Sequence, residues 1–202
     1  MTPADIFNKL QGEFGDEVVF NFNDGSEGDK DPWCQVEPFR IEDVGTLLKS
    51  DPTLHCDYLE CVTGTDFPDD EQIQVVYHVY SYVKKHRIVL KAFLDREDPV
   101  IPTLTDVWST ANWQERECFD LLGVLFDGHP DLRRLLLPED WEGHPMRKDY
   151  EEADDYHGIP TIRPNPIELF AISLPDKDAA ADEGEAADAA DAETATAVEE
   201  EV

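Results

Sequence analysis

Two copies of Gly-His-Pro are the first candidates for chemistry in this sequence. They occupy residues 128–130 and 143–145, and each is followed closely by a basic pair, Arg133-Arg134 and Arg147-Lys148. A glycine before the histidine lets the backbone turn sharply, and a proline after it favours an extended histidine. Imidazoles and basic side chains placed in this way could bind a metal ion, perform catalysis or grip a partner.

A metal site would need three or four converging ligands. The candidates here are His129, Asp131, His144 and His157, whose histidines are spaced by fifteen and thirteen residues. These spacings match no zinc pattern, so we predict no metal site. A free-standing metal-dependent hydrolase built on the first three of these residues stays open as an alternative.

The cysteines do not predict a redox or catalytic site. The chain has four, at positions 34, 56, 61 and 118, and none forms a CxxC pair. Cys118 falls on an apolar helix stripe, where a thiol is inert, and no nucleophile signature surrounds it. There is also no GxGxxG or GxxxxGK[ST] loop. We therefore expect reduced thiols, no catalytic residue and no nucleotide, flavin or iron–sulfur site in this chain.

Glu115 is the clearest buried charge that the sequence predicts. It shares a helical face with Ala111, Cys118 and Leu122, and a buried carboxylate must be paired or protonated. Arginine is the side chain best suited to such pairing. We therefore predict that Glu115 or Glu117 binds one of the basic residues that follow, namely Arg133, Arg134, Arg147 or Lys148.

The elements that must position these residues follow from capping and periodicity. Thr2, Pro3 and Asp5 mark the start of a helix that Gly15 ends, and a second helix is predicted over 39–49. Alternating patterns predict strands over 18–22, 33–36, 55–63, 72–82 and 86–94. This α-β-β-α-β-β-β order predicts a two-layer α+β fold, with helices on one face of a mainly antiparallel or mixed sheet.

Four segments follow from these patterns. Residues 1–95 form the α+β core domain, and residues 96–123 are a connector and a helix over 111–122 that begins at Thr110 as its N-cap and ends at Gly123. Residues 124–175 are rich in proline and in large apolar side chains, which predicts an extended arm that covers a partner protein. Residues 176–202 are rich in alanine and acids and are predicted to be a disordered tail.

Charge and hydropathy limit the partners and the location. The net charge of −31 argues against nucleic acids and anionic lipid surfaces. No run approaches the roughly 20 apolar residues of a membrane-spanning helix. The first residues lack the basic start and apolar stretch of a signal peptide, so we expect a cytoplasmic location or the cytoplasmic side of a membrane.

The central segment closely resembles the signature of one family, the C subunit of respiratory NADH-quinone oxidoreductase, the bacterial counterpart of the mitochondrial 30 kDa subunit of complex I. The match is specific from about Pro102 to Tyr150 and compatible over residues 1–95. Its motif residues, to which the resemblance assigns structural roles and contacts with other subunits, are Glu115, Arg116, Glu117, Asp120, Gly123, Gly128, His129, Pro130, Asp131, Arg133, Arg134, Gly143, Pro145, Arg147, Lys148 and Asp149. Departures from the pattern are Cys118, Leu122, Met146 and Glu151.

The resemblance implies a non-catalytic structural subunit of the hydrophilic arm of a proton-translocating complex. That complex passes electrons from NADH through FMN and Fe-S clusters to quinone, and this chain would hold none of these cofactors. Its partners would be chiefly the large quinone-site subunit, called D, and also subunits B and I, at the cytoplasmic side of the cell inner membrane. The alternative that the signature leaves open is the equivalent subunit of a membrane-bound hydrogenase or of an F420H2- or ferredoxin-linked complex.

Overall fold

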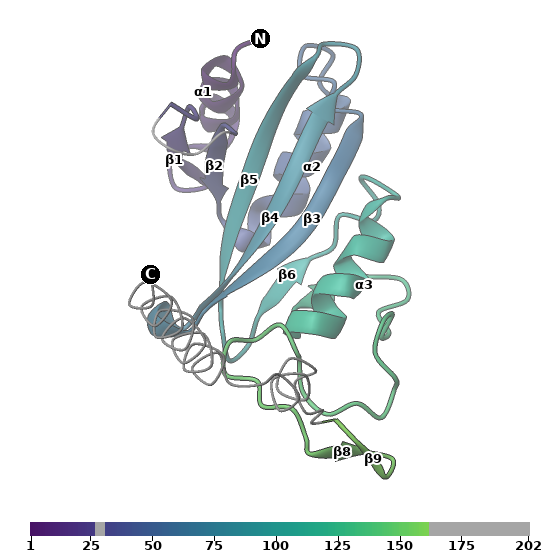
Figure 1. Ribbon diagram of the computed structural model, residues 1–202. Helices are drawn as coiled ribbons and strands as arrows, with labels where there is room; N and C mark the ends of the chain where they lie inside the picture. The colour runs from purple at the N-terminus through teal and green to yellow at the C-terminus, as the bar shows by residue number, and fades with distance from the viewer. Residues whose placement is uncertain (27–30, 162–202) are drawn as a thin grey trace, which may run out of the picture. The chain divides into compact units, whose positions relative to one another are not determined.

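The computed structural model describes residues 1–26 and 31–161 of the chain, which divides into two units, Met1–Glu151 and one that begins at Glu152. The first unit contains a five-stranded sheet, three α-helices and a short parallel pair of strands (Figure 1). In chain order its helices and strands are α1 (Pro3–Phe14), β1 (Val19–Asn23), β2 (Trp33–Val36), α2 (Ile41–Ser50), β3 (Tyr58–Phe67), β4 (Gln72–Ser81), β5 (His86–Asp95), β6 (Val100–Pro102), α3 (Ala111–Leu122) and β7 (Leu125–Asp127).

The main sheet has the strand order β1-β2-β5-β4-β3. Its pairs are antiparallel except β2 and β5, which run parallel. Strands β4 and β5 pair without interruption from Gln72 opposite Asp95 to Ser81 opposite His86. The predicted mixed, mainly antiparallel sheet is therefore confirmed, and so is the α+β class.

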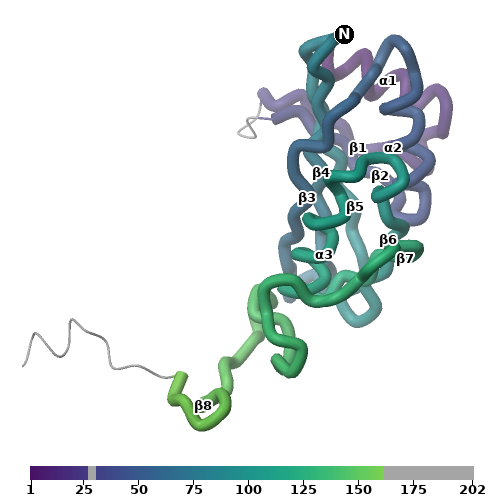
Figure 2. The backbone as a smooth tube through the Cα atoms, turned by 90° about the vertical axis from the view of Figure 1, so that its right-hand side faces the viewer, coloured from purple at the N-terminus to yellow at the C-terminus, as the bar shows by residue number. Residues whose placement is uncertain are grey.

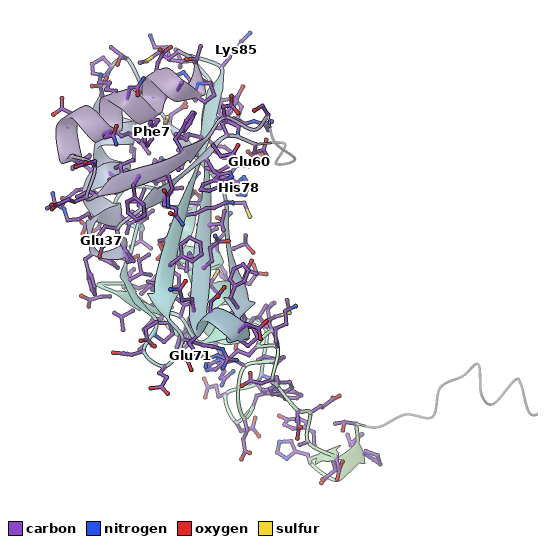
Figure 3. The ribbon with its side chains drawn as sticks, turned by 90° about the vertical axis from the view of Figure 1, so that its left-hand side faces the viewer. Phe7, Glu37, Glu60, Glu71, His78 and Lys85 are labelled. Carbon is purple, nitrogen blue, oxygen red and sulfur yellow. The ribbon has the colours of Figure 1, made fainter. Side chains whose placement is uncertain are left out.

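One face of this sheet holds the hydrophobic core. Ile73, Val75, Tyr77 and Val79 alternate along β4 and are buried with the apolar residues of α1 and α2. Helices α1 and α2 lie on the same side of β3, β4 and β5 in Figure 2, as the prediction of helices on one face requires. On the opposite face, His78 is half-buried, and Figure 3 shows it on the side of the sheet away from Phe7 of α1.

Local signals set the ends of most elements. Thr2 and Asp5 exchange the two hydrogen bonds of a capping box at the start of α1, and Gly15 is its C-cap, as predicted. Strand β3 begins and ends later than predicted, at Tyr58 and Phe67. It extends because a 3-10 turn, Pro68–Asp70, closed by Glu71 in the left-handed region, lets Phe67 pair with Gln72.

The predicted connector of residues 96–110 is more ordered than a linker. It contains β6, which pairs in parallel with β7 directly after α3. Thr110 stands at the N-terminus of α3 but does not cap it through its side chain. Its backbone is already helical, and its hydroxyl donates instead to the Leu59 carbonyl at 3.4 Å. The predicted helix bounds, with Thr110 before Ala111 and Gly123 after Leu122, are confirmed.

The second unit contains a two-stranded antiparallel hairpin, β8 (Asp155–Tyr156) and β9 (Ile159–Pro160). His157 and Gly158 form its turn with φ angles of 51° and 78°, the positive values that a two-residue hairpin turn of type I′ requires. The predicted disordered tail and the last part of the predicted arm lie outside the described residues. Among the helices of the described part, none is long and apolar enough to cross a membrane.

Candidate functional site

Asp120 on α3 is the centre of the site that the motif builds. Its side chain is fully buried, and one carboxylate oxygen accepts the backbone N–H groups of Leu135, Leu136 and Leu137 at 3.0, 2.7 and 2.9 Å. Arg134 donates to the other oxygen at 3.0 Å. Burial raises the pKa of Asp120, but these four donors outweigh it and hold the pKa below its usual value.

The arginines of the motif fasten the following segment to α3 through backbone carbonyls. Arg134 also donates to the carbonyls of Trp141 and Gly143. Arg116 is 6% exposed and donates to the carbonyls of Arg133 and Arg134 at 3.1 and 3.3 Å. A guanidinium has five N–H donors in a fixed plane, so one arginine can hold two turns of a chain that lacks regular structure.

Both Gly-His-Pro histidines are also bound to α3. His129 Nε2 lies 3.1 Å from the Asn112 carbonyl oxygen, while its Nδ1 accepts the backbone N–H of Asp131. His144 Nδ1 lies 3.0 Å from the Asp120 carbonyl oxygen, and burial lowers the pKa of its imidazole, which keeps the ring neutral. The preceding glycines, Gly128 and Gly143, have φ angles of 80° and 78°. Each histidine therefore binds a backbone carbonyl of α3 directly after a glycine turn.

Gly123 makes the close approach of His144 possible. It ends α3 with a φ of 80°, and a Cβ atom on it would lie 2.6 Å from the Nε2 atom of His144. Arg147 then donates to the carbonyl of Leu122 at 2.8 Å, so the second basic pair also closes the end of α3. The last turn of this helix is thus capped by a glycine, an imidazole and a guanidinium.

Glu115 is fully buried, as predicted, but it binds no arginine. It accepts hydrogen bonds from the hydroxyl of Thr103 and from the backbone N–H of Leu104, the latter at 2.7 Å. Burial raises the pKa of Glu115 to about 7, because these two hydrogen bonds offset only part of the desolvation. Its carboxylate therefore joins α3 to the segment that follows β6.

The predicted pairing of Glu115 or Glu117 with a downstream basic residue is wrong. Five residues separate Glu115 from Asp120, which turns the two side chains about 140° apart around the helix. Glu115 faces Thr103, Glu117 is exposed, and Asp120 faces the segment that carries Arg134. The direction of the helix face, which periodicity does not give, decides which carboxylate meets the arginine.

A second group of polar contacts joins the segment around Lys148 to the sheet, and it was not predicted from the sequence. Asp66 at the end of β3 is buried and accepts two hydrogen bonds from Arg96, at 2.7 and 3.0 Å, and one from the backbone N–H of Lys148 at 2.8 Å. Arg96 also pairs with Asp149 at 2.5 Å. The signal was a carboxylate on the inward face of β3, but the predicted strand stopped at Thr63.

The remaining motif residues lie near the surface. Arg133 forms an ion pair with Asp131 at 3.0 Å in which both side chains are largely exposed. Pro130 is exposed, and Pro145 is half-buried. Residues 124–151 belong to the compact unit Met1–Glu151. That this segment also covers a partner protein stays a prediction.

The histidines, cysteines and acids of the described residues bear on the alternative chemistries. Among the described residues, no group of three or more His, Cys, Asp and Glu side chains is arranged to hold a metal ion. Burial raises the pKa of the Cys118 thiol to about 12, so it carries almost no thiolate at neutral pH. The four cysteines are free thiols.

Two large apolar side chains of this segment, Trp113 and Met146, are exposed, whereas Leu122 and Phe126 are buried. Trp113 is 61% exposed and Met146 is 58% exposed, while Glu115 and Asp120 on the same helix as Trp113 are fully buried. A groove of about 70 Å³ is lined by residues of β3 and α3 and by Met146. The buried charges hold the chain together, and the exposed apolar groups are available to a partner.

Comparisons with known proteins agree on one family. The family model described as the 30 kDa subunit of respiratory-chain NADH dehydrogenase matches residues 34–156. The chain is 39% identical over 156 residues to the C subunit of the NADH-quinone oxidoreductase of Chlorobium phaeobacteroides, covering 76% of this chain and 91% of that protein. It is 47% identical over 145 residues to the corresponding protein of Roseiflexus castenholzii, covering 71% and 81%.

Two solved structures are similar in fold. The trypsin-resistant fragment of Nqo5 aligns with a TM-score of 0.54 and 27% identity, covering 65% of this chain and all of that fragment. A chain of the archaeal membrane-bound sulfane sulfur reductase, described as a respiratory membrane complex, aligns with a TM-score of 0.60. The second match has 20% identity and covers 75% of this chain and 86% of the other, and it concerns the fold alone.

Proposed function

The chain belongs to the family of the 30 kDa subunit of respiratory-chain NADH dehydrogenase and is thus a subunit of an NADH-quinone oxidoreductase, in which we propose that it is structural and non-catalytic. The observation that carries this proposal is the use of the motif's charged groups. Asp120, Arg134 and Arg116 bind their own chain, while Trp113 and Met146 remain exposed. A structural subunit needs such a rigid surface.

The partners and the location follow from that role. The chain docks chiefly on the large quinone-site subunit, called D, and lies near subunits B and I, as a peripheral protein on the cytoplasmic side of the cell inner membrane. NADH, FMN, the Fe-S clusters and quinone are bound by other subunits. Consistent with this division, each motif histidine and cysteine described above is occupied by a backbone carbonyl or buried as a neutral thiol.

A native pull-down from the organism's own membranes tests this function. The full-length tagged chain is purified, its companions are identified by mass spectrometry, and the eluate is assayed for NADH:quinone activity, with an untagged strain as control. We expect subunits B, D and I together with the activity. Recovery of the chain alone, monodisperse and with a stoichiometric metal, would contradict the proposal and favour the hydrolase alternative.

The signature from Pro102 to Tyr150 is the ground for a second candidate, the equivalent subunit of a membrane-bound hydrogenase or of an F420H2- or ferredoxin-linked complex. The same eluate separates the two possibilities, because the electron donor is a direct readout. Reduction of quinone by NADH supports the first possibility. Companions of a hydrogenase or of an F420H2- or ferredoxin-linked complex, with no NADH oxidation, would support the second.

A further inference from the structure

One side of α3 carries a row of side chains that are exposed or, at Leu121, half-buried. Trp113, Glu117 and Leu121 follow one another at four-residue spacing, which places them above one another on the helix. Met146 continues the row, because its backbone N–H donates to the Leu121 carbonyl at 3.0 Å. We name Trp113, Glu117, Leu121 and Met146 the α3 stripe.

A groove of about 70 Å³ runs beside the α3 stripe, between α3 and β3. Val62, Gly64, Leu122 and Met146 line it, together with the neutral thiol of Cys118. This volume exceeds the roughly 10–15 Å³ that a cavity needs to hold one water molecule. The groove therefore has room for the branched end of one aliphatic side chain.

The exposed tryptophan of the α3 stripe is already held in position. The guanidinium of Arg116 lies 4.9 Å from the centre of the Trp113 ring, and Arg116 is itself fixed by two backbone carbonyls. An immobilised aromatic side chain loses little conformational entropy when it binds, and tryptophan is among the residues that contribute most to protein interfaces. Trp113 therefore has the properties of an interface anchor.

Acidic side chains lie beside the groove, and the basic groups near it, Arg116 and Arg147, are bound to backbone carbonyls. Glu117 belongs to the α3 stripe, and Glu60 is adjacent, since Gln114 donates to its carbonyl at 3.3 Å. Burial and the charges of Glu117 and Glu60 together raise the pKa of the nearby Cys61 thiol, which places both carboxylates around this point. A partner that carries lysine or arginine is attracted here, whereas a second copy of this chain, with a net charge of −31, is repelled.

We propose that the α3 stripe and its groove bind a segment of another subunit, which places an aliphatic side chain in the groove and a lysine or arginine beside Glu117. This inference rests on the proposed function, because it requires the chain to work inside a multi-subunit complex. The acidic tail of this chain, with eleven acids and one lysine after Pro175, has the wrong charge for this position.

Site-specific photo-cross-linking in the intact complex tests the occupant. Met146 is replaced by p-benzoylphenylalanine in the full-length chain, and Tyr82, which is 60% exposed and directly follows β4, is replaced in a control. We expect position 146 to cross-link to a peptide of another subunit that has an aliphatic residue next to lysine or arginine. Position 82 should not give that product. A cross-link to residues 162–202 of this chain, to a second copy, or to nothing while the complex is intact would overturn the proposal.

Charge reversal provides an independent measurement. Glu117→Lys should lower the yield of chain in the purified complex by at least about tenfold at low salt, and Trp113→Ala should do so at any salt. Glu13→Lys, an exposed acid on α1, is the matched control and should leave the yield unchanged. Unfolding curves of each variant confirm that the fold is retained.

The two failures are distinguishable. If the wild-type chain brings down no other subunit, the proposed function fails. If the wild-type chain assembles, and the Glu117 and Trp113 variants assemble equally well, the role assigned to the α3 stripe fails while the proposed function stands.

Discussion

At the scale of single residues, the site depends on buried carboxylates that are satisfied in different ways. Asp120 and Asp66 are charged and are surrounded by N–H donors, so the pKa of each lies below its ordinary value. Glu115 has two donors and no opposite charge, and its pKa is raised to about 7. Three carboxylates of similar burial therefore respond oppositely to pH.

Removing the charge of Asp120 should destabilise the protein severely. Asp120→Asn removes the buried partner of Arg134, whose side chain is 19% exposed, and breaking such a pair costs up to about 5 kcal/mol. Urea unfolding of the two proteins measures this difference in the free energy of unfolding. The control is Asp131→Asn, which removes an exposed ion pair and should change stability by less than about 1 kcal/mol. Equal effects of the two changes would contradict the role of Asp120.

The raised pKa of Glu115 predicts a pH dependence of stability. The unfolded carboxyl group ionises near 4.5 and the folded one near 7, so its contribution to stability is complete below pH 4.5 and is lost as pH rises to about 7. Glu115→Gln is always neutral and should gain up to about 3 kcal/mol relative to wild type across this window. Glu117→Gln, on the exposed side of the same helix, is the control, and its stability should change with pH as that of the wild type does.

The lowered pKa values of Asp120 and Asp66 act in another window. Their contribution is present above the ordinary carboxyl pKa of 3.8 and is lost as pH falls below it. The loss therefore occurs at more acidic pH than the Glu115 effect.

A wild-type stability curve that showed no decline between pH 4.5 and 7 relative to Glu115→Gln would refute the assignment of Glu115.

At the scale of elements, α3 is held at both ends and on two sides. Glu115 binds the segment after β6, Asp120 binds residues 134–137, and Leu122 packs over Gly64 of β3. A Cβ on Gly64 would lie 2.3 Å from the Leu122 Cδ1 atom, so the helix rests directly on the strand backbone. The position of α3 is therefore fixed more by polar contacts and a close approach than by a large apolar stripe.

Gly123→Ala should separate the end of α3 from the segment that covers it. The added methyl group meets a left-handed backbone and the His144 ring, which together should cost about 2–4 kcal/mol. Gly12→Ala is the matched control. Gly12 lies inside α1 with nothing within 4 Å of its Cβ position, so alanine should stabilise the helix by about 0.5–1 kcal/mol. Thermal unfolding shows whether each variant is less or more stable than the wild-type chain. A Gly123→Ala variant as stable as the wild type would contradict the packing.

At the scale of the whole molecule, charge is the dominant feature. The chain carries 47 acidic and 16 basic residues, and the ion pairs among its described residues use only a few of the acids. Self-repulsion of this kind lowers the stability of the folded state and is screened by salt. It also selects basic partners over acidic ones, which agrees with the acidic groove beside α3.

Salt should stabilise the isolated chain, and the tail should contribute to this effect. The Debye length falls from about 10 Å at 0.1 M salt to about 3 Å at 1 M, so the free energy of unfolding should rise over this range. A chain truncated after Pro175 loses eleven acids and one lysine, and its stability should depend less on salt. Denaturant midpoints at several salt concentrations give the salt dependence of stability for the full-length and the truncated chain. The same salt dependence in both chains would show that the tail does not act on the folded unit.

The truncated chain also tests assembly. We expect it to enter the complex as well as the full-length chain does, because an acidic, alanine-rich extension has little apolar surface to bury. Failure of the truncated chain to assemble, with its fold intact, would show that the tail contacts another subunit.

The sequence by itself determined the elements and the family of this protein. The capping box at Thr2, the alternation along residues 72–82 and the glycine after residue 122 are local signals, and the structure follows each of them. The motif from Pro102 to Tyr150 likewise needs no coordinates to be identified. Such features depend on interactions between residues that are close together in the chain, so a sequence pattern is enough to predict them.

Only the tertiary structure decided which charge meets which partner. Glu115 and Asp120 are five residues apart on one helix, and the packing of α3 on β3 turns the first toward Thr103 and the second toward Arg134. The same packing brings Asp66 to Lys148 across 82 residues. The packing of α3 on β3 also leaves the α3 stripe on the outside of the helix. Those pairings depend on how elements rotate against one another, and that rotation is set by long-range packing, which spacing along the chain does not contain.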